Sequence, residues 1–128
     1  MKRKNILKLA FVSAIALASP ASFAASNSVE ISSPIHDDKV NKIFKVYGNC
    51  GMCKKTIEGA LSNAKGVVKA VWNKETKMME VTFHEHKITL DEIKKKIAGV
   101  GYDTDEFKAT DKSYNGLPGC CQYERPTN

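Results

Sequence analysis

The chain has 128 residues, which is enough for one domain of ordinary size with short extensions. Hydrophobic residues make up 42% of the chain and charged residues 27%, a balance that argues against a disordered or a membrane-embedded protein. Lys and Arg number 20 against 14 Asp and Glu, for a formal charge of +6. Four Cys allow one metal site or two disulfides, but not a disulfide-dense miniprotein.

Residues 1–24 are predicted to be a cleaved signal peptide. A basic head over residues 2–8 precedes an apolar run over 9–18, and small residues follow up to Ala24. A membrane anchor is the alternative, but a span needs about 20 apolar residues and this run is half as long. Cleavage after Ala24 would export the mature chain, which we expect in the periplasm of a bacterium.

The charge of the mature chain argues against a nucleic-acid partner. Residues 1–24 hold four basic residues and no acidic one, so the formal charge of +6 falls to +2 without them. The remaining sequence has no long Lys/Arg stripe with interleaved aromatic residues. None of its segments is apolar enough to span a membrane, so we expect a soluble mature form. The oligomeric state is left open.

The first half of the mature chain predicts a linker, a strand and a helix. Residues 25–41 are polar and are expected to form a flexible linker. The β-branched and aromatic run over 43–47 predicts a strand. From Lys54 onward apolar residues recur at helical spacing, and Gly66 is a natural helix end.

The second half predicts a hairpin, a helix and a last strand. Residues 67–72 and 77–83 form the hairpin, because apolar and polar residues alternate in the second run. Thr89 and Glu92 form a capping box at the start of a helix whose residues 94–96, all Lys, are expected to face water. Residues 102–109 predict the last strand, and the acidic cluster of Asp103, Asp105 and Glu106 near it is expected to lie on a solvated face.

The order of these elements predicts the fold class. Strand, helix, strand, strand, helix, strand over residues 42–109 indicates an α+β protein of the ferredoxin-like type. In that arrangement a four-stranded antiparallel sheet carries two helices on one face. Residues 110–128 are too short for a further domain and form a C-terminal tail that contains Cys120 and Cys121.

The motif that carries chemistry is Cys50-Gly-Met-Cys53. Cys50 ends a loop and Cys53 opens a helix, where free N–H groups and the helix dipole favour thiolate over thiol. Two thiolates at this spacing suit a soft ion such as Cu(I), which we rank first, or Hg(II). Zn(II) would require two more ligands. We expect both side chains to lie outside the core, so that replacing either would weaken metal binding without disturbing the fold.

Two other roles for this Cys pair stay open. One is a structural disulfide. The other is a thioredoxin-type redox pair in a thiol–disulfide oxidoreductase. Against this role, the thioredoxin fold requires a proline before a later strand, and the only later prolines are in the tail. The sequence has no Ser/His/Asp set, no paired carboxylates and no phosphate-cradling Gly loop, so we do not expect an enzyme.

Residues 46–61, which read VYGNCGMCKKTIEGAL, resemble the heavy-metal-associated domain family. Gly66-Val67 and Gly101-Tyr102 match the family's pattern further on, and the resemblance covers about residues 42–109. It implies a metallochaperone-like carrier that receives a heavy-metal ion and passes it to a metal transporter or efflux partner. It also implies that the Tyr102 ring packs beside the loop that carries Cys50 and Cys53, here called the metal loop. The family has a Met, packed under that loop, where this chain has Gly48.

The tail and one loop supply further candidate ligands. The tail is long enough for Cys120 and Cys121 to reach the loop that carries Cys50 and Cys53. There they would add one or two thiolate ligands or form a disulfide with Cys50 or Cys53. His84 and His86 are weaker candidates, because their loop should lie at the opposite end of the sheet.

Overall fold

The computed structural model describes residues 38–127. Its elements are the strands β1 (Lys39–Lys45), β2 (Val67–Trp72) and β3 (Met78–His84), the helices α1 (Gly51–Ser62), α2 (Leu90–Gly99) and α3 (Asp111–Asn115), and a 3-10 turn η1 (Gly119–Cys121). The predicted signal peptide and most of the predicted linker lie outside these residues. No helix among residues 38–127 is long and apolar enough to cross a membrane.

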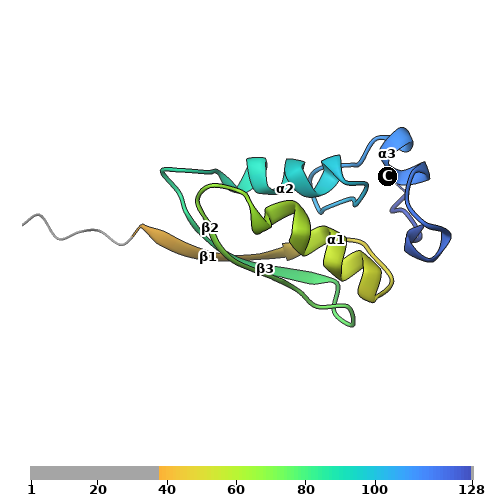
Figure 1. Cartoon of the computed structure of the whole chain (residues 1–128), viewed down its shortest axis with the longest axis horizontal. Coiled ribbons are helices and arrows are strands. Elements are labelled where there is room, and N and C mark those ends of the chain that lie inside the picture. Colours follow the sequence, from red (N-terminus) through yellow and green to blue (C-terminus); the bar gives the residue numbers. More distant parts are fainter. Residues whose placement is uncertain (1–37, 128) are drawn as a thin grey trace, which may run out of the picture. The chain divides into compact units, whose positions relative to one another are not determined.

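The three strands form one antiparallel sheet in the order β1-β3-β2. Lys39 lies opposite His84 and Lys45 lies opposite Met78, so the end of β1 meets the beginning of β3. Helices α1 and α2 lie side by side on one face of the sheet (Figure 1). This confirms the α+β class and the pair of helices, and the arrangement is consistent with the ferredoxin-like type.

The predicted fourth strand over residues 102–109 is not a strand in the structure. Its residues make one isolated antiparallel bridge, between Thr104 and Val46, flanked by hydrogen bonds from Tyr47 N–H to Asp103 O and from Asp105 N–H to Lys45 O. The segment then turns away, because the Thr104 hydroxyl accepts hydrogen bonds from the N–H groups two and three residues on. Side-chain hydrogen bonding of this kind competes with a strand ladder.

Several element boundaries also differ from the prediction, most of all the beginnings of β1 and α1. Strand β1 begins at Lys39, inside the predicted linker, and α1 begins at Gly51 instead of Lys54. In β1 only Phe44 is fully buried, so the early part of the strand lacks the apolar alternation that would reveal it. That part is held by polar contacts instead, such as those of the Asn41 amide with Glu80 and Thr82 on β3.

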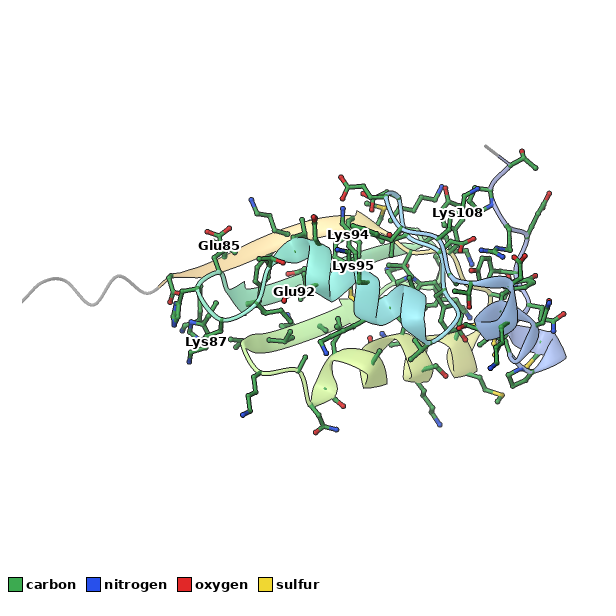
Figure 2. The ribbon with its side chains drawn as sticks, turned by 90° about the horizontal axis from the view of Figure 1, so that it is seen from above. Glu85, Lys87, Glu92, Lys94, Lys95 and Lys108 are labelled. Carbon is green, nitrogen blue, oxygen red and sulfur yellow. The ribbon has the colours of Figure 1, made fainter. Side chains whose placement is uncertain are left out.

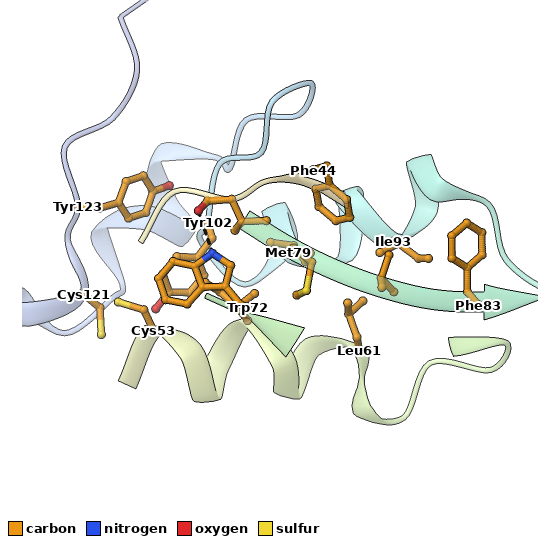
Figure 3. Close-up of a cluster of buried hydrophobic side chains, with 14 of the residues drawn as sticks. Phe44, Cys53, Leu61, Trp72, Met79, Phe83, Ile93, Tyr102, Cys121 and Tyr123 are labelled. Atoms are coloured by element: carbon orange, nitrogen blue, oxygen red, sulfur yellow. Dashed lines mark hydrogen bonds between the residues drawn. The ribbon is translucent and has the colours of Figure 1, made fainter. Parts of the chain in front are cut away.

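The core lies between the sheet and the two helices and continues into the tail. The alternation predicted for β3 buries Met79, Val81 and Phe83, which pack against residues of both helices. The predicted capping box of α2 is present, with Thr89 and Glu92 bonded to each other's backbone N–H groups. Cys121 and Tyr123 of the tail belong to the same buried cluster (Figure 3).

Lys94 corrects the expectation that residues 94–96 all face water. Its side chain is only 3% exposed, and its ammonium group lies 3.0 Å from Asp105 and 2.7 Å from Glu106. The same group sits over the Phe44 ring, so the side chain lies between α2 and β1 (Figure 2). Two members of the acidic cluster, expected to be merely solvated, therefore bind the segment after Tyr102 to α2.

Candidate metal centre

Three of the four thiols meet at one end of the domain. Cys50 Sγ lies 3.3 Å from Cys53 Sγ and 3.8 Å from Cys121 Sγ, and the three sulfur atoms all lie within 4.8 Å of one another. Figure 3 shows Cys121 beside Cys53 at the edge of the core. All four Cys are free thiols.

The local sequence places the first two thiols at the start of α1. Cys50 is the N-cap residue, with an extended backbone and no capping side chain, and is partly buried. Cys53 lies in the first turn and is fully buried, and its sulfur accepts a hydrogen bond from the Asn49 N–H at 3.3 Å. The expectation that both side chains lie outside the core is therefore wrong for Cys53.

The two ends of the thiol cluster differ in acidity. The pKa of Cys50 falls to about 7, chiefly because the backbone N–H of Cys53 donates to its sulfur, and the Cys53 thiol adds to this. Burial raises the pKa of Cys121 to about 12. Near neutral pH Cys50 is thus substantially thiolate, whereas Cys121 keeps its proton.

Trp72 supports the loop where the family has a Met. A Cβ on Gly48 would lie 3.0 Å from two ring carbons of Trp72 and 3.3 Å from Cys53 Cβ. The indole N–H donates to Val46 O at 3.0 Å, which fixes the ring under the loop. A bulky ring beneath the backbone explains why residue 48 is small. Met52, between the two Cys in the first turn of α1, is 52% exposed.

The Tyr102 ring packs beside the metal loop, as the resemblance implied. The residue is fully buried, and its hydroxyl faces the Cys53 and Cys121 thiols. Burial, followed by these two thiols, raises the pKa of the phenol far above its ordinary value. The hydroxyl has no hydrogen-bond partner of normal geometry within residues 38–127.

Tyr123 docks the tail on this end of the domain. Its ring stacks on Tyr102 with a centroid separation of 5.7 Å and meets Tyr114 edge-on at 5.1 Å. Its hydroxyl donates to Gly101 O at 3.0 Å and accepts from the Asp103 N–H at 2.7 Å. The Asn49 amide, one residue before Cys50, also donates to Gln122 O at 3.3 Å. The tail is thus bonded directly to the metal loop.

An ion pair completes the docking. The Arg125 guanidinium binds both carboxylate oxygens of Asp103, at 2.7 and 2.8 Å, and also reaches Ala109 O and Asp111. Asp103 is fully buried. Burial pushes the pKa of this carboxyl up, but the bonds from Arg125 and from the Ala109 N–H outweigh it and hold the pKa below its ordinary value. No local sequence pattern predicts this pair, because its partners lie 22 residues apart in the chain.

The two tail thiols separate. Cys121 is 1% exposed and joins the cluster, whereas Cys120 is exposed and lies 3.8 Å from Met52 Sδ and 3.9 Å from Cys121 Sγ. Adjacent residues in a 3-10 turn point in different directions, so only one of them can enter the site. The position of the docked tail places Cys121 in the site and leaves Cys120 outside it.

His84 and His86 lie at the other end of the sheet, as predicted. Both rings contact the Asp38 carboxylate through Nδ1, with His84 at 3.0 Å. These three residues form a second group with metal-ligating side chains. The carboxylate joins the beginning of β1 to the loop after β3, which accounts for the contacts without an ion.

Comparison with known proteins agrees with this fold. The model of the heavy-metal-associated domain matches residues 44–103. The copper chaperone CopZ of Staphylococcus aureus is 36% identical over 63 residues, which are 48% of this chain and 93% of CopZ. A putative copper-ion-binding protein from Bacillus anthracis is 28% identical, with a TM-score of 0.50 over 52% of this chain and 96% of that one.

A third protein supports the fold alone. The N-terminal domain of a potential copper-translocating P-type ATPase from Bacillus subtilis, solved in its Cu(I)-loaded state, is 22% identical and has a TM-score of 0.51 over 57% of this chain and 92% of that domain. The fold and the paired thiols together define a heavy-metal-binding module. The chain belongs to the heavy-metal-associated domain family. The family match ends before the tail that carries Cys121.

Proposed function

We propose that the protein is an exported metallochaperone that binds Cu(I) through Cys50 and Cys53 and transfers it to a partner protein. The observation that carries this proposal is the pair of thiols 3.3 Å apart at the beginning of α1, in the part of the chain that is similar to a copper chaperone. Export rests on the signal-like sequence of residues 1–24.

Cu(I) is the preferred cargo because of the ligand type. Thiolates select soft ions, and two of them satisfy Cu(I) or Hg(II), whereas Zn(II) is ordinarily held by four ligands. Hg(II) is therefore the second choice and Zn(II) the third. The lowered pKa of Cys50 makes a thiolate available near pH 7, so binding there releases fewer protons.

Transfer would proceed by ligand exchange and not by catalysis of a reaction. Cys50 is only partly buried. An incoming thiolate from a metal transporter or efflux protein can therefore bind the ion there before the bond between the ion and Cys53 breaks. No bond other than metal–sulfur bonds changes in this exchange. The ion is the cargo, and the protein is not an enzyme in this proposal.

The test is Cu(I) binding by anaerobic protein in competition with a chromophoric Cu(I) chelator. Wild type should bind one ion, and Cys50→Ser and Cys53→Ser should each lose affinity by orders of magnitude. His84→Ala is the matched control, because His84 lies at the far end of the sheet, and it should bind as wild type does. A single Cys variant that binds as tightly as wild type would refute the proposed site.

The same protein should be assayed for insulin reduction. The lowered pKa of Cys50 is also what an attacking thiol in an oxidoreductase requires. Reductase turnover without tight Cu(I) binding would replace the carrier by a thiol–disulfide oxidoreductase. Stoichiometric Cu(I) binding without turnover would support the carrier.

A further inference from the structure

We propose that Cys121 is a third thiolate ligand, so that the C-terminal tail closes a three-sulfur site around the ion. This inference rests on the proposed function, since it assumes that Cys50 and Cys53 bind a soft metal. It goes beyond it by assigning a ligand to a segment that lies outside the family match and by giving the tail a role in retaining the ion.

The spacing of the sulfur atoms fits a trigonal site. Metal–sulfur bonds of about 2.3 Å at equal angles hold three sulfurs about 4 Å apart, whereas a linear two-sulfur site holds them about 4.6 Å apart. Cys50 Sγ lies 3.8 Å from Cys121 Sγ and 3.3 Å from Cys53 Sγ, and no pair of the three exceeds 4.8 Å. Small shifts of the side chains would thus admit one ion among all three.

The Tyr102 hydroxyl is a second observation that points to a ligand. A buried hydroxyl without a hydrogen bond destabilises the fold, and this one faces the Cys53 and Cys121 thiols. A metal-bound thiolate is a better hydrogen-bond acceptor than a neutral thiol, because it carries charge. Loading the site would therefore give the phenol the acceptor that it lacks, and Tyr102 would act as a positioning residue for the two sulfurs.

The contacts of the tail hold Cys121 in place before any ion arrives. Gln122, the next residue, accepts a hydrogen bond from the Asn49 amide, and Tyr123 and Arg125 fix the chain just beyond. Preorganised ligands lose less conformational freedom on binding, which raises affinity. These contacts do not bring Cys120 into the site, because it stays exposed beside Met52.

The chemistry of loading involves protons and no electrons. Cu(I) bonds to three sulfurs, the thiols that are still protonated release their protons to water, and copper keeps its oxidation state. A partner protein must then displace Cys121 as well as Cys50 and Cys53 before it can take the ion. The third thiolate therefore slows transfer and favours retention of the cargo.

X-ray absorption of the full chain with one equivalent of Cu(I), prepared anaerobically, counts the sulfur ligands. Wild type should show three sulfurs, and Cys121→Ser should show two, with affinity weaker by about tenfold or more. Cys120→Ser is the matched control: it removes a neighbouring thiol outside the cluster and should keep three sulfurs and full affinity. Two sulfurs in wild type would overturn the third ligand and leave the carrier intact, whereas no Cu(I) binding at all would refute both.

A second measurement avoids substitution, in case Cys121→Ser disturbs the core. Wild-type protein with and without Cu(I) is treated with iodoacetamide, and the modified Cys are located by mass spectrometry. In the loaded form Cys120 should react while Cys50, Cys53 and Cys121 are protected. If the tail is docked but not bonded to the ion, Cu(I) will leave the rate of Cys121 alkylation unchanged, and that result would overturn the inference.

Discussion

Replacing Arg125 by Met should release the tail from the domain. The change leaves the Asp103 carboxylate, which is fully buried, without its cation. Breaking a buried ion pair by removing one partner costs about 3–5 kcal/mol. Arg125 is itself 23% exposed, and Asp103 keeps its bond from the Ala109 N–H, so we expect a smaller cost of about 2–3 kcal/mol.

Asp111→Asn is the matched control for this prediction. Asp111 accepts a bond from the same guanidinium at 2.8 Å but is 92% exposed. An exposed ion pair contributes less than about 1 kcal/mol, so this variant should be nearly as stable as wild type. In the double variant with Asp103→Asn, part of the loss caused by Arg125→Met should return, because no unpaired charge remains buried.

Urea unfolding followed by the fluorescence of the single Trp measures these stabilities, and the alkylation rate of Cys121 reports tail docking. The pKa of Asp103 is lowered in the folded state, so its stabilisation is complete above the unfolded carboxyl pKa of about 3.9 and is lost as the pH falls through the lower folded value. The difference between wild type and Arg125→Met should therefore be largest near neutral pH and should shrink as the pH falls and the Asp103 carboxyl is protonated in both folded proteins. Equal stability of the Arg125 and Asp111 variants would refute the reasoning.

Two further predictions concern the metal loop. Gly48→Ala should lower the free energy of unfolding by about 1–3 kcal/mol, because the new methyl group would press on Trp72, while Gly51→Ala, which has open space, should not; thermal unfolding compares the two. Cys53→Ser should lose stability as well as Cu(I) affinity because its thiol is buried, whereas Cys50→Ser should lose affinity alone, and urea unfolding of the metal-free variants separates them. Equal stability of the two Cys variants would contradict the burial argument.

The sequence determined the features that depend on neighbours in the chain. The capping box of Thr89 and Glu92, the alternation along β3 and the Cys-x-x-Cys motif at the beginning of a helix all arise within a few residues, and the structure has each of them. The same local signals predicted the two helices and the α+β class. They also located the loop where Cys50 and Cys53 meet.

Which residues surround the Cys50 and Cys53 thiols depends on contacts between distant parts of the chain. Cys121 joins Cys50 across a sequence separation of 71 residues, and Arg125 neutralises Asp103 across 22. Neither contact leaves a periodic pattern, because each depends on how the tail crosses the domain. The burial of Lys94 and the absence of the predicted strand over residues 102–109 both result from side-chain bonds made by residues 103–109. Such bonds compete with a strand ladder, and the propensities of residues along the chain do not predict them.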